Sequence, residues 1–277
     1  MTDQECVALL QWALPRLGLR WSGFRRVRRQ VCKRLSRRMT DLGLSGAAAY
    51  RARLEADASE WSVLDANCWI SISRFYRDRG VFENLAREIL PELACAASAR
   101  GRRLLRAWSA GCASGEEPYS VRLAWQLAVT SVAPGVELDI LATDASAELL
   151  GRARRALYPA STLDELPAAW RAAAFERLDD RYRLRDDFRR GVRFRQQDIR
   201  KAMPAGPFDL ILCRNLAFTY FELDVQGAIQ RELARRLVPG GALLVGTHEA
   251  LPEPTALIPS LRTCGLYRAP DEVHSRR

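Results

Sequence analysis

Histidine is nearly absent from this chain, whose 277 residues include only His248 and His274. Cysteine is present, but no two of its residues form a C-x-x-C pair; the seven are Cys6, Cys32, Cys68, Cys95, Cys112, Cys213 and Cys264. Because protein zinc sites are built mainly from these two residue types at close spacing, we expect no metal. An odd, dispersed set of cysteines predicts reduced thiols and a cytoplasmic protein.

Long apolar runs are also missing. No stretch approaches the roughly 20 apolar residues that span a bilayer, and the opening "MTDQECVALLQWALPRLGL" carries acids where a secretory signal carries basic residues. We therefore expect no signal peptide and no membrane insertion.

Lysine and arginine outnumber aspartate and glutamate by 43 to 33, a net charge of +10. This excess favours an acidic partner or simple solubility, and no recognition module supports nucleic acid.

The residue composition and the hydrophobic pattern of the chain change near residue 97. Residues 1–97 have few glycines and repeat leucine and arginine at three- and four-residue spacing, which predicts a helical N-terminal domain. In residues 98–277, apolar runs within 102–111, 136–144, 207–215 and 240–249 alternate with helical stretches. This alternation predicts an α/β domain with a doubly wound, mostly parallel sheet. Partial alternation over 182–199 predicts a hairpin or small sheet, hence a small insertion near 176–197.

Polar residues end three of the four predicted strands. They are Glu116-Glu117 after the first strand, Asp144 at the end of the second and Arg214-Asn215 after the third. Sheets of this kind bind ligands beyond the carboxyl ends of their strands, so these side chains are candidates for one site.

The first of these strands runs into the turn "WSAGCASGEEPYS", residues 108–120. The turn lacks the G-x-G-x-x-G spacing, and two acids at its end would repel a phosphate. A carboxylate there suits an ammonium group. Asp144 suits the two hydroxyls of a ribose; the other interpretation is an N-cap of the following helix, and the two roles are compatible. A cofactor with an ammonium group, a ribose and no phosphate fits both positions, and we predict S-adenosylmethionine.

Several segments in order resemble the CheR family of chemotaxis methyltransferases, which are S-adenosylmethionine-dependent protein-glutamate O-methyltransferases. They are "KRLSRRMTDLGL", "SISRFYRD", "WSAGCASGEEPYS", "ATDASAELLGRARRALY" and "FDLILCRN" with the later "YF" and "LVPGG". The resemblance implies the family's fold, its activity on glutamate side chains of chemoreceptors, and S-adenosylhomocysteine as the product.

The resemblance also implies residue roles. The implied cofactor-binding residues are Ser71, Ser73, Arg77, Gly111, Glu117, Asp144, Asp198, Ile199, Arg214 and Asn215. Glu117 would hold the amino group, Gly111 would line the turn, and Asp198-Ile199 would lie beside the adenine.

Two of the implied roles are catalytic. Arg77 would hold one oxygen of the acceptor carboxylate while the other attacks, with a surface ion pair as its alternative. Tyr220 would orient the acceptor, unless it is a core aromatic.

The basic N-terminal helix is the implied docking element. Arg34, Arg37 and Arg38 share one helix face, which in the family faces an acidic receptor bundle. Arg25, Arg26, Arg28 and Arg29 would extend this face into a long basic strip. A solvated face is the alternative.

The chain departs from the family pattern in several places. Ser71 replaces the usual Asn, "CRNLAFTYF" has one extra residue before Tyr220, and "GTHEALP" leaves His248-Glu249 without a task. The segment "FERLDDRYRLRDD" is short and lacks glycines, which argues against docking to a receptor's C-terminal tail.

Two rival hypotheses remain beside glutamate methylation. One is a methyltransferase of the same fold that acts on a small molecule or an unrelated protein. The other is a module without activity that binds an acidic partner or nucleic acid through its arginines.

Overall fold

The computed structural model describes residues 1–271, which divide into two compact units. The first unit is Met1–Ile72 together with Thr219–Gln226, and the second is Ser73–Phe218 together with the chain from Gly227 onward. The helices over 79–99 lie mostly within the N-terminal domain that the composition predicted. They belong instead to the second unit, because their apolar side chains are part of its core. The units therefore part after residue 72 and not at residue 97.

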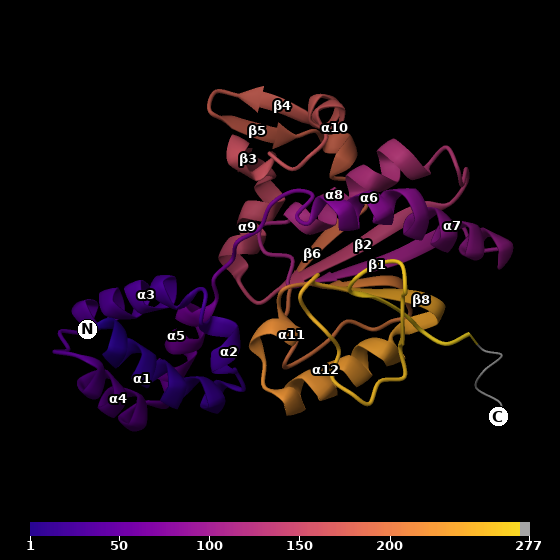
Figure 1. Ribbon diagram of the computed structural model, residues 1–277. Helices are drawn as coiled ribbons and strands as arrows, with labels where there is room; N and C mark the ends of the chain where they lie inside the picture. The colour runs from indigo at the N-terminus through magenta and orange to yellow at the C-terminus, as the bar shows by residue number, and fades with distance from the viewer. Residues whose placement is uncertain (272–277) are drawn as a thin grey trace. The chain divides into compact units, whose positions relative to one another are not determined.

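Helices build the first unit (Figure 1). Their bounds are α1 (Asp3–Ala13), η1 (Leu14–Leu17), α2 (Trp21–Phe24), α3 (Arg28–Asp41), α4 (Ala47–Ala56) and α5 (Ala58–Cys68). The later segment joins them through backbone hydrogen bonds: Arg20 N–H donates to Tyr220 O at 2.8 Å and Glu222 N–H to Gly18 O at 2.9 Å. A glycine is needed at position 23, because a Cβ there would lie 2.3 Å from Thr219 O.

One buried carboxylate ties three of these helices together. Glu60 of α5 is 2% exposed and accepts two hydrogen bonds from Arg38 of α3, at 3.0 and 2.7 Å. The hydroxyl of Tyr50, on α4, donates to the same carboxylate at 2.9 Å. The Arg38 hydrogen bond is the main reason that the pKa of Glu60 lies below its ordinary value.

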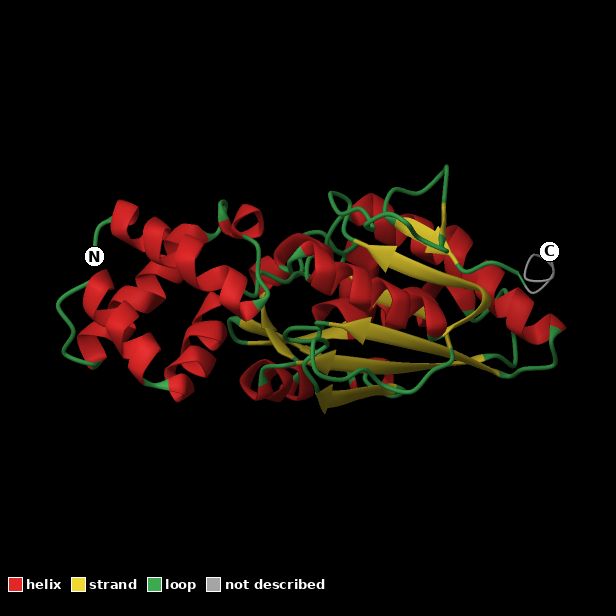
Figure 2. Ribbon diagram, turned by 90° about the horizontal axis from the view of Figure 1, so that it is seen from below, coloured by secondary structure: helices red, strands yellow, loops and turns green. Residues whose placement is uncertain are grey.

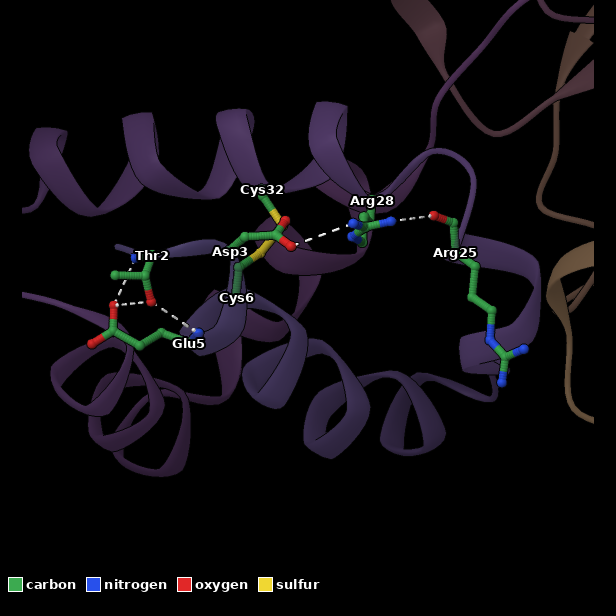
Figure 3. Close-up of a disulfide and its surroundings, with 7 residues drawn as sticks. All are labelled: Thr2, Asp3, Glu5, Cys6, Arg25, Arg28 and Cys32. Carbon is green, nitrogen blue, oxygen red and sulfur yellow. Dashed lines mark hydrogen bonds and ion pairs between the residues drawn. A yellow bond between two sulfur atoms is a disulfide. The ribbon is translucent and has the colours of Figure 1, made fainter.

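A disulfide joins Cys6 of α1 to Cys32 of α3 (Figure 3), with the Cα atoms 5.9 Å apart. The prediction that all the cysteines are reduced is wrong for this pair. The two lie 26 residues apart, and only the packing of α1 against α3 brings them together. Beside the disulfide, Arg28 forms an ion pair with Asp3 at 3.4 Å.

A seven-stranded, mostly parallel sheet organises the second unit within residues 73–271 (Figures 1 and 2), which confirms the predicted fold class. The strand order is β6-β2-β1-β7-β8-β10-β9, and only β10 and β9 run antiparallel to their neighbours. Its strands are β1 (Leu104–Ala110), β2 (Glu137–Asp144), β6 (Val192–Gln196), β7 (Phe208–Cys213), β8 (Leu237–Val245), β9 (Ile258–Pro259) and β10 (Leu266–Arg268). The strands near the centre are apolar runs, because both faces of the sheet are covered.

A separate small sheet has the order β3-β5-β4. Its strands are β3 (Leu157–Pro159), β5 (Arg181–Leu184) and β4 (Phe175–Leu178). The hairpin expected over 182–199 does not form, since β5 pairs within the small sheet and β6 pairs with β2. The small sheet therefore spans 157–184 and starts earlier than the predicted insertion.

Helices cover both faces of the large sheet, with α6, α7 and α8 on one face and α12 on the other (Figure 1). Two helices, α11 (Ala217–Tyr220) and α12 (Leu223–Arg235), cross the boundary between the units. The helical segments that lie wholly in the second unit are α6 (Arg79–Asn84), η2 (Leu85–Ile89), α7 (Leu90–Ala99), α8 (Glu116–Ala124), η3 (Trp125–Val129), α9 (Ala147–Arg155), η4 (Ala160–Thr162), α10 (Ala168–Ala174) and η5 (Asp186–Phe188). Among residues 1–271, no helix has the length and apolar character that crossing a bilayer requires.

Replacing Glu60 with alanine should lower the free energy of unfolding by about 2–4 kcal/mol, because Arg38 and Tyr50 lose their shared partner. Urea denaturation measures this loss. Glu55→Ala is the matched control: it removes an exposed ion pair with Arg51 and should cost about 0.5 kcal/mol or less. Since the pKa of Glu60 is lowered, its contribution should persist at neutral pH and disappear only as the pH falls below the ordinary value of 4.5. Equal losses for the two variants would contradict the prediction.

Candidate active site

The predicted strand ends meet where the sheet reverses its winding. From β1 the chain proceeds outward through β2 and β6, and it then returns to the other side of β1 with β7 and β8. The carboxyl ends of β1, β2 and β7 therefore lie at the switch point, where α/β sheets bind ligands. These ends lead to Glu117, Asp144 and Arg214, respectively.

The turn between β1 and α8 depends on two glycines in the left-handed region. Gly111 has a φ of 77° and Gly115 a φ of 90°. A Cβ at Gly111 would come within 2.5 Å of Leu216 Cδ2. The N–H of Gly111 donates to Thr143 O at 2.8 Å, which fixes the turn against the end of β2.

Asp144 closes this turn with its carboxylate. One oxygen accepts the N–H of Ala113 and the other accepts the N–H of Ser146, each at 2.9 Å. Burial raises the pKa of Asp144 above its ordinary value in spite of these two bonds. The alternative role as cap of α9 is wrong, because the capping side chain is that of Ser146, which accepts the N–H of Leu149.

Glu117 and Arg214 form a buried ion pair at the centre of the switch point. Arg214 Nη1 lies 3.3 Å from Glu117 Oε2, and the Ser109 hydroxyl donates to Glu117 Oε1 at 2.7 Å. The side chain of Arg214 is 2% exposed, and its Nη2 donates to Asp78 Oδ2 at 2.6 Å and to Arg77 O at 3.0 Å. Burial raises the pKa of Glu117, although Arg214 and, more weakly, Arg77 oppose the shift.

The neighbouring acid, Glu116, has a different environment. It is 3% exposed, and its carboxyl group interacts with the Ser73 hydroxyl. Within the described chain its Oε2 has no hydrogen-bond partner, and burial raises its pKa. The two adjacent acids of the turn therefore contact different groups, since consecutive helical residues point about 100° apart.

Asp198 lies beside the end of β2 and next to Ile199, which is 8% exposed. The N–H of Gln197 donates to Asp144 O at 2.9 Å, which brings this segment to the switch point. Arg200 holds the Asp198 carboxylate with two side-chain hydrogen bonds, at 3.1 and 2.8 Å, and keeps its pKa below the ordinary value against the effect of burial.

Glu249, for which the sequence pattern predicted no role, also lies at these strand ends. Its Oε2 accepts the N–H groups of Asn215 and Gly246, both at 2.7 Å, and so joins the ends of β7 and β8. Asn215 has a φ of 53°, a left-handed conformation that these bonds hold. The sequence signal for Glu249 was that a glutamate follows the last parallel strand, as Glu116 and Glu117 follow the first. His274 lies outside the described residues.

The other predicted site residues belong to the first unit. Ser71 is exposed, and the ring of Tyr220 packs with Phe24 and Trp69, with centroids 5.0 and 6.1 Å away. Their cofactor and catalytic roles stay predictions.

The predicted docking arginines also lie in the first unit. Arg34 donates to Trp69 O at 2.6 Å, and Arg38 is held by Glu60. Of the three, Arg37 has an exposed side chain.

The donor set at the switch point fits a cofactor with an ammonium group and a ribose. Asp144 uses each oxygen for one backbone N–H, so both keep a lone pair for a ribose hydroxyl. Glu117 likewise keeps acceptor capacity on both oxygens. Among the described residues, no three His, Cys, Asp or Glu side chains gather as metal ligands. The fold and these residues define an α/β protein that binds a nucleoside cofactor.

Comparison with known proteins narrows this class. Residues 71–263 match the family described as CheR methyltransferase, SAM binding domain. A chemotaxis protein methyltransferase of Listeria monocytogenes is 35% identical over 185 residues, which cover 67% of each chain. A probable chemotaxis protein methyltransferase of Rhizobium etli is 32% identical over 229 residues, 79% of this chain and 83% of the relative. The chain belongs to the CheR methyltransferase family, and its cofactor is S-adenosylmethionine.

Replacing Glu249 with alanine should destabilise the second unit by about 2–3 kcal/mol, since one buried and one partly buried N–H group lose this acceptor. Urea denaturation checks this value. Glu253→Ala is the control, because the exposed Thr255 N–H is the hydrogen-bond donor to Glu253 among residues 1–271, and its loss should cost less than about 1 kcal/mol. If Glu249→Ala is as stable as the control, the two hydrogen bonds do not hold the strand ends.

Proposed function

We propose that this protein transfers a methyl group from S-adenosylmethionine to glutamate side chains of a chemoreceptor or a chemoreceptor-like helical protein. One observation carries the proposal: Arg214 donates both to the carboxylate of Glu117, at 3.3 Å, and to the backbone carbonyl of Arg77, at 3.0 Å. The residue whose guanidinium suits a carboxylate acceptor is thereby joined to the proposed ligand of the cofactor's ammonium group. The names of the curated relatives, chemotaxis protein methyltransferases, support the same acceptor.

Each part of the cofactor has a proposed partner in the second unit. Glu117 holds the ammonium group, Asp144 the ribose hydroxyls, and Asp198 with Ile199 the adenine. Gly111 lets the backbone approach, and Ser73 borders the methionine end. Arg214 and Asn215 act mainly by holding this arrangement, which is supported by the burial of Arg214 and the left-handed φ of Asn215.

Methyl transfer requires mainly that the acceptor oxygen, the methyl carbon and the sulfur lie in line. S-adenosylmethionine, when bound, supplies an electrophilic methyl group. A glutamate carboxylate is ionised near pH 7 and needs no base. Arg77 binds one carboxylate oxygen and so directs the other along the line of attack. Burial of the strand ends removes water from the acceptor oxygen.

The first unit is the proposed docking domain for the acceptor. Exposed cations recur along α3 at Arg29, Lys33 and Arg37, one per turn over about 12 Å of helix. We propose these three as the docking strip, since Arg34 and Arg38 are used within the unit. An acidic helix complements such a row.

Calorimetry with S-adenosylhomocysteine tests the cofactor site. We expect micromolar affinity, and a loss of about 1–3 kcal/mol for Glu117→Ala and for Asp144→Ala. Glu137→Ala, at the exposed opposite end of β2, is the control and should bind as the wild type does. Because the carboxyl pKa values of Glu117 and Asp144 are raised, affinity should fall with decreasing pH while the pH is still above the ordinary values of 4.5 and 3.8. Unchanged binding by both site variants would refute the assignment.

Incubation with tritiated S-adenosylmethionine and a purified chemoreceptor cytoplasmic fragment tests the acceptor. Label released as a volatile product by mild base identifies glutamate esters. Arg77→Ala should reduce turnover more than it reduces S-adenosylhomocysteine affinity. Label that resists base, or that appears only on small molecules, would favour the rival acceptor.

Charge reversal tests the docking strip. Changing Arg29, Lys33 and Arg37 to glutamate should raise the KM for the receptor fragment at least about tenfold at low salt, with S-adenosylhomocysteine affinity unchanged. The difference should shrink as the salt concentration rises. Reversal of Arg51 and Arg53 on α4, compared with reversal of Lys33 and Arg37 alone, serves as the control for net charge, since each pair changes the charge by the same amount. An equal effect from the control would show that overall charge, and not this helix face, draws the acceptor.

A further inference from the structure

The backbone on both sides of Arg77 adopts conformations that side chains disfavour. Tyr76 has a φ of 61° and Asp78 a φ of 63°, both in the left-handed region. Asparagine, aspartate and glycine enter this region most readily, and a bulky residue such as tyrosine rarely does. Two such residues around one arginine point to a segment that its surroundings hold in place.

Separate groups hold the two unfavourable residues. On the Asp78 side, Arg214 donates to Arg77 O at 3.0 Å and to Asp78 Oδ2 at 2.6 Å. On the Tyr76 side, the hydroxyl of Ser120 accepts the N–H of Tyr76 at 2.9 Å. The Tyr76 ring is 1% exposed and stacks on Phe82, with centroids 5.1 Å apart, so its side chain is fixed as well.

Ser120 is a residue of α8, the helix whose first turn carries Glu117. It is fully buried, and its hydroxyl donates to Glu116 O at 2.7 Å while it accepts from Tyr76. Serine inside a helix is less favourable than alanine, and a bond to the carbonyl four residues back does not compensate. The contact with Tyr76 gives this position a reason for a hydroxyl.

We propose that Ser120 is a positioning residue for Arg77. It accepts the Tyr76 N–H, holds the left-handed backbone before Arg77, and fixes that backbone to the helix that carries Glu117. The guanidinium that directs the acceptor and the carboxylate that holds the cofactor thus keep a constant separation. The inference rests on the proposed function for its consequence in catalysis, and on the contacts alone for the order of residues 73–78.

Hydrogen exchange and kinetics on the full chain test the proposal in Ser120→Ala. Peptic fragments that cover residues 73–82 should exchange at least about tenfold faster than in the wild type, because the Tyr76 N–H loses its acceptor. The Kd for S-adenosylhomocysteine should stay within about twofold. In the receptor-fragment assay kcat should fall about tenfold or more, while the KM for S-adenosylmethionine changes little.

Two further variants provide controls. Thr130→Ala removes an exposed hydroxyl that donates to the carbonyl of Gln126, four residues back, and should leave exchange and kcat unchanged. Ser120→Thr keeps the acceptor oxygen and should restore the protection of residues 73–82 and most of kcat.

Unchanged exchange in residues 73–82 of Ser120→Ala would overturn the proposal. A parallel loss of S-adenosylhomocysteine affinity would also overturn it, since the hydroxyl would then act on the whole site. Failure of Ser120→Ala to fold, while both controls fold, would make the hydroxyl a requirement of the fold instead. If the wild type esterifies no glutamate, the proposed function fails, and the exchange and affinity measurements still decide whether Ser120 holds the segment.

Discussion

The second unit depends on the burial of one guanidinium. Arg214 is almost fully enclosed, and a charge in that position is stable only with good partners. It finds them in Glu117, in Asp78 and in the carbonyl of Arg77, which lies 137 residues earlier in the chain. Glu117, Asp78 and Asp144 are three carboxylates against the two guanidiniums of Arg214 and Arg77, so the switch point keeps an excess of negative charge when all three are ionised. A cationic ligand is the natural complement of that excess.

The same constraint explains why the turn after β1 ends in two acids. Glu117 faces Ser109 and Arg214, whereas Glu116 is directed to Ser73. One carboxylate therefore joins α8 to the ends of β1 and β7, and the other joins it to the segment before Arg77. Both have raised pKa values because burial disfavours their charged forms. Glycine in the turn lets the backbone pass closely enough for both contacts.

The basic side chains of α3, in the first unit, have different roles. Arg38 and Arg34 hold helices together through Glu60 and the Trp69 carbonyl, while Arg29, Lys33 and Arg37 remain on the surface of α3. Helical spacing puts Arg34, Arg37 and Arg38 on one face but does not say which of them neighbouring helices will engage. The Cys6–Cys32 bond likewise follows from the packing of α1 against α3. Neither can be inferred from spacing alone.

Local pattern was enough to determine the alternation of strands and helices, the polar residues at the strand ends and the motifs of the family. These depend on short-range periodicity and on turn chemistry, which a single sequence displays. The division after residue 72, the small sheet over 157–184, and the roles of Glu249 and Ser120 were decided only in three dimensions. Each of them depends on contacts between residues far apart in the chain, such as Ser120 with Tyr76, which are 44 residues apart. No local pattern encodes such a contact, because it exists only once the sheet and its helices have packed.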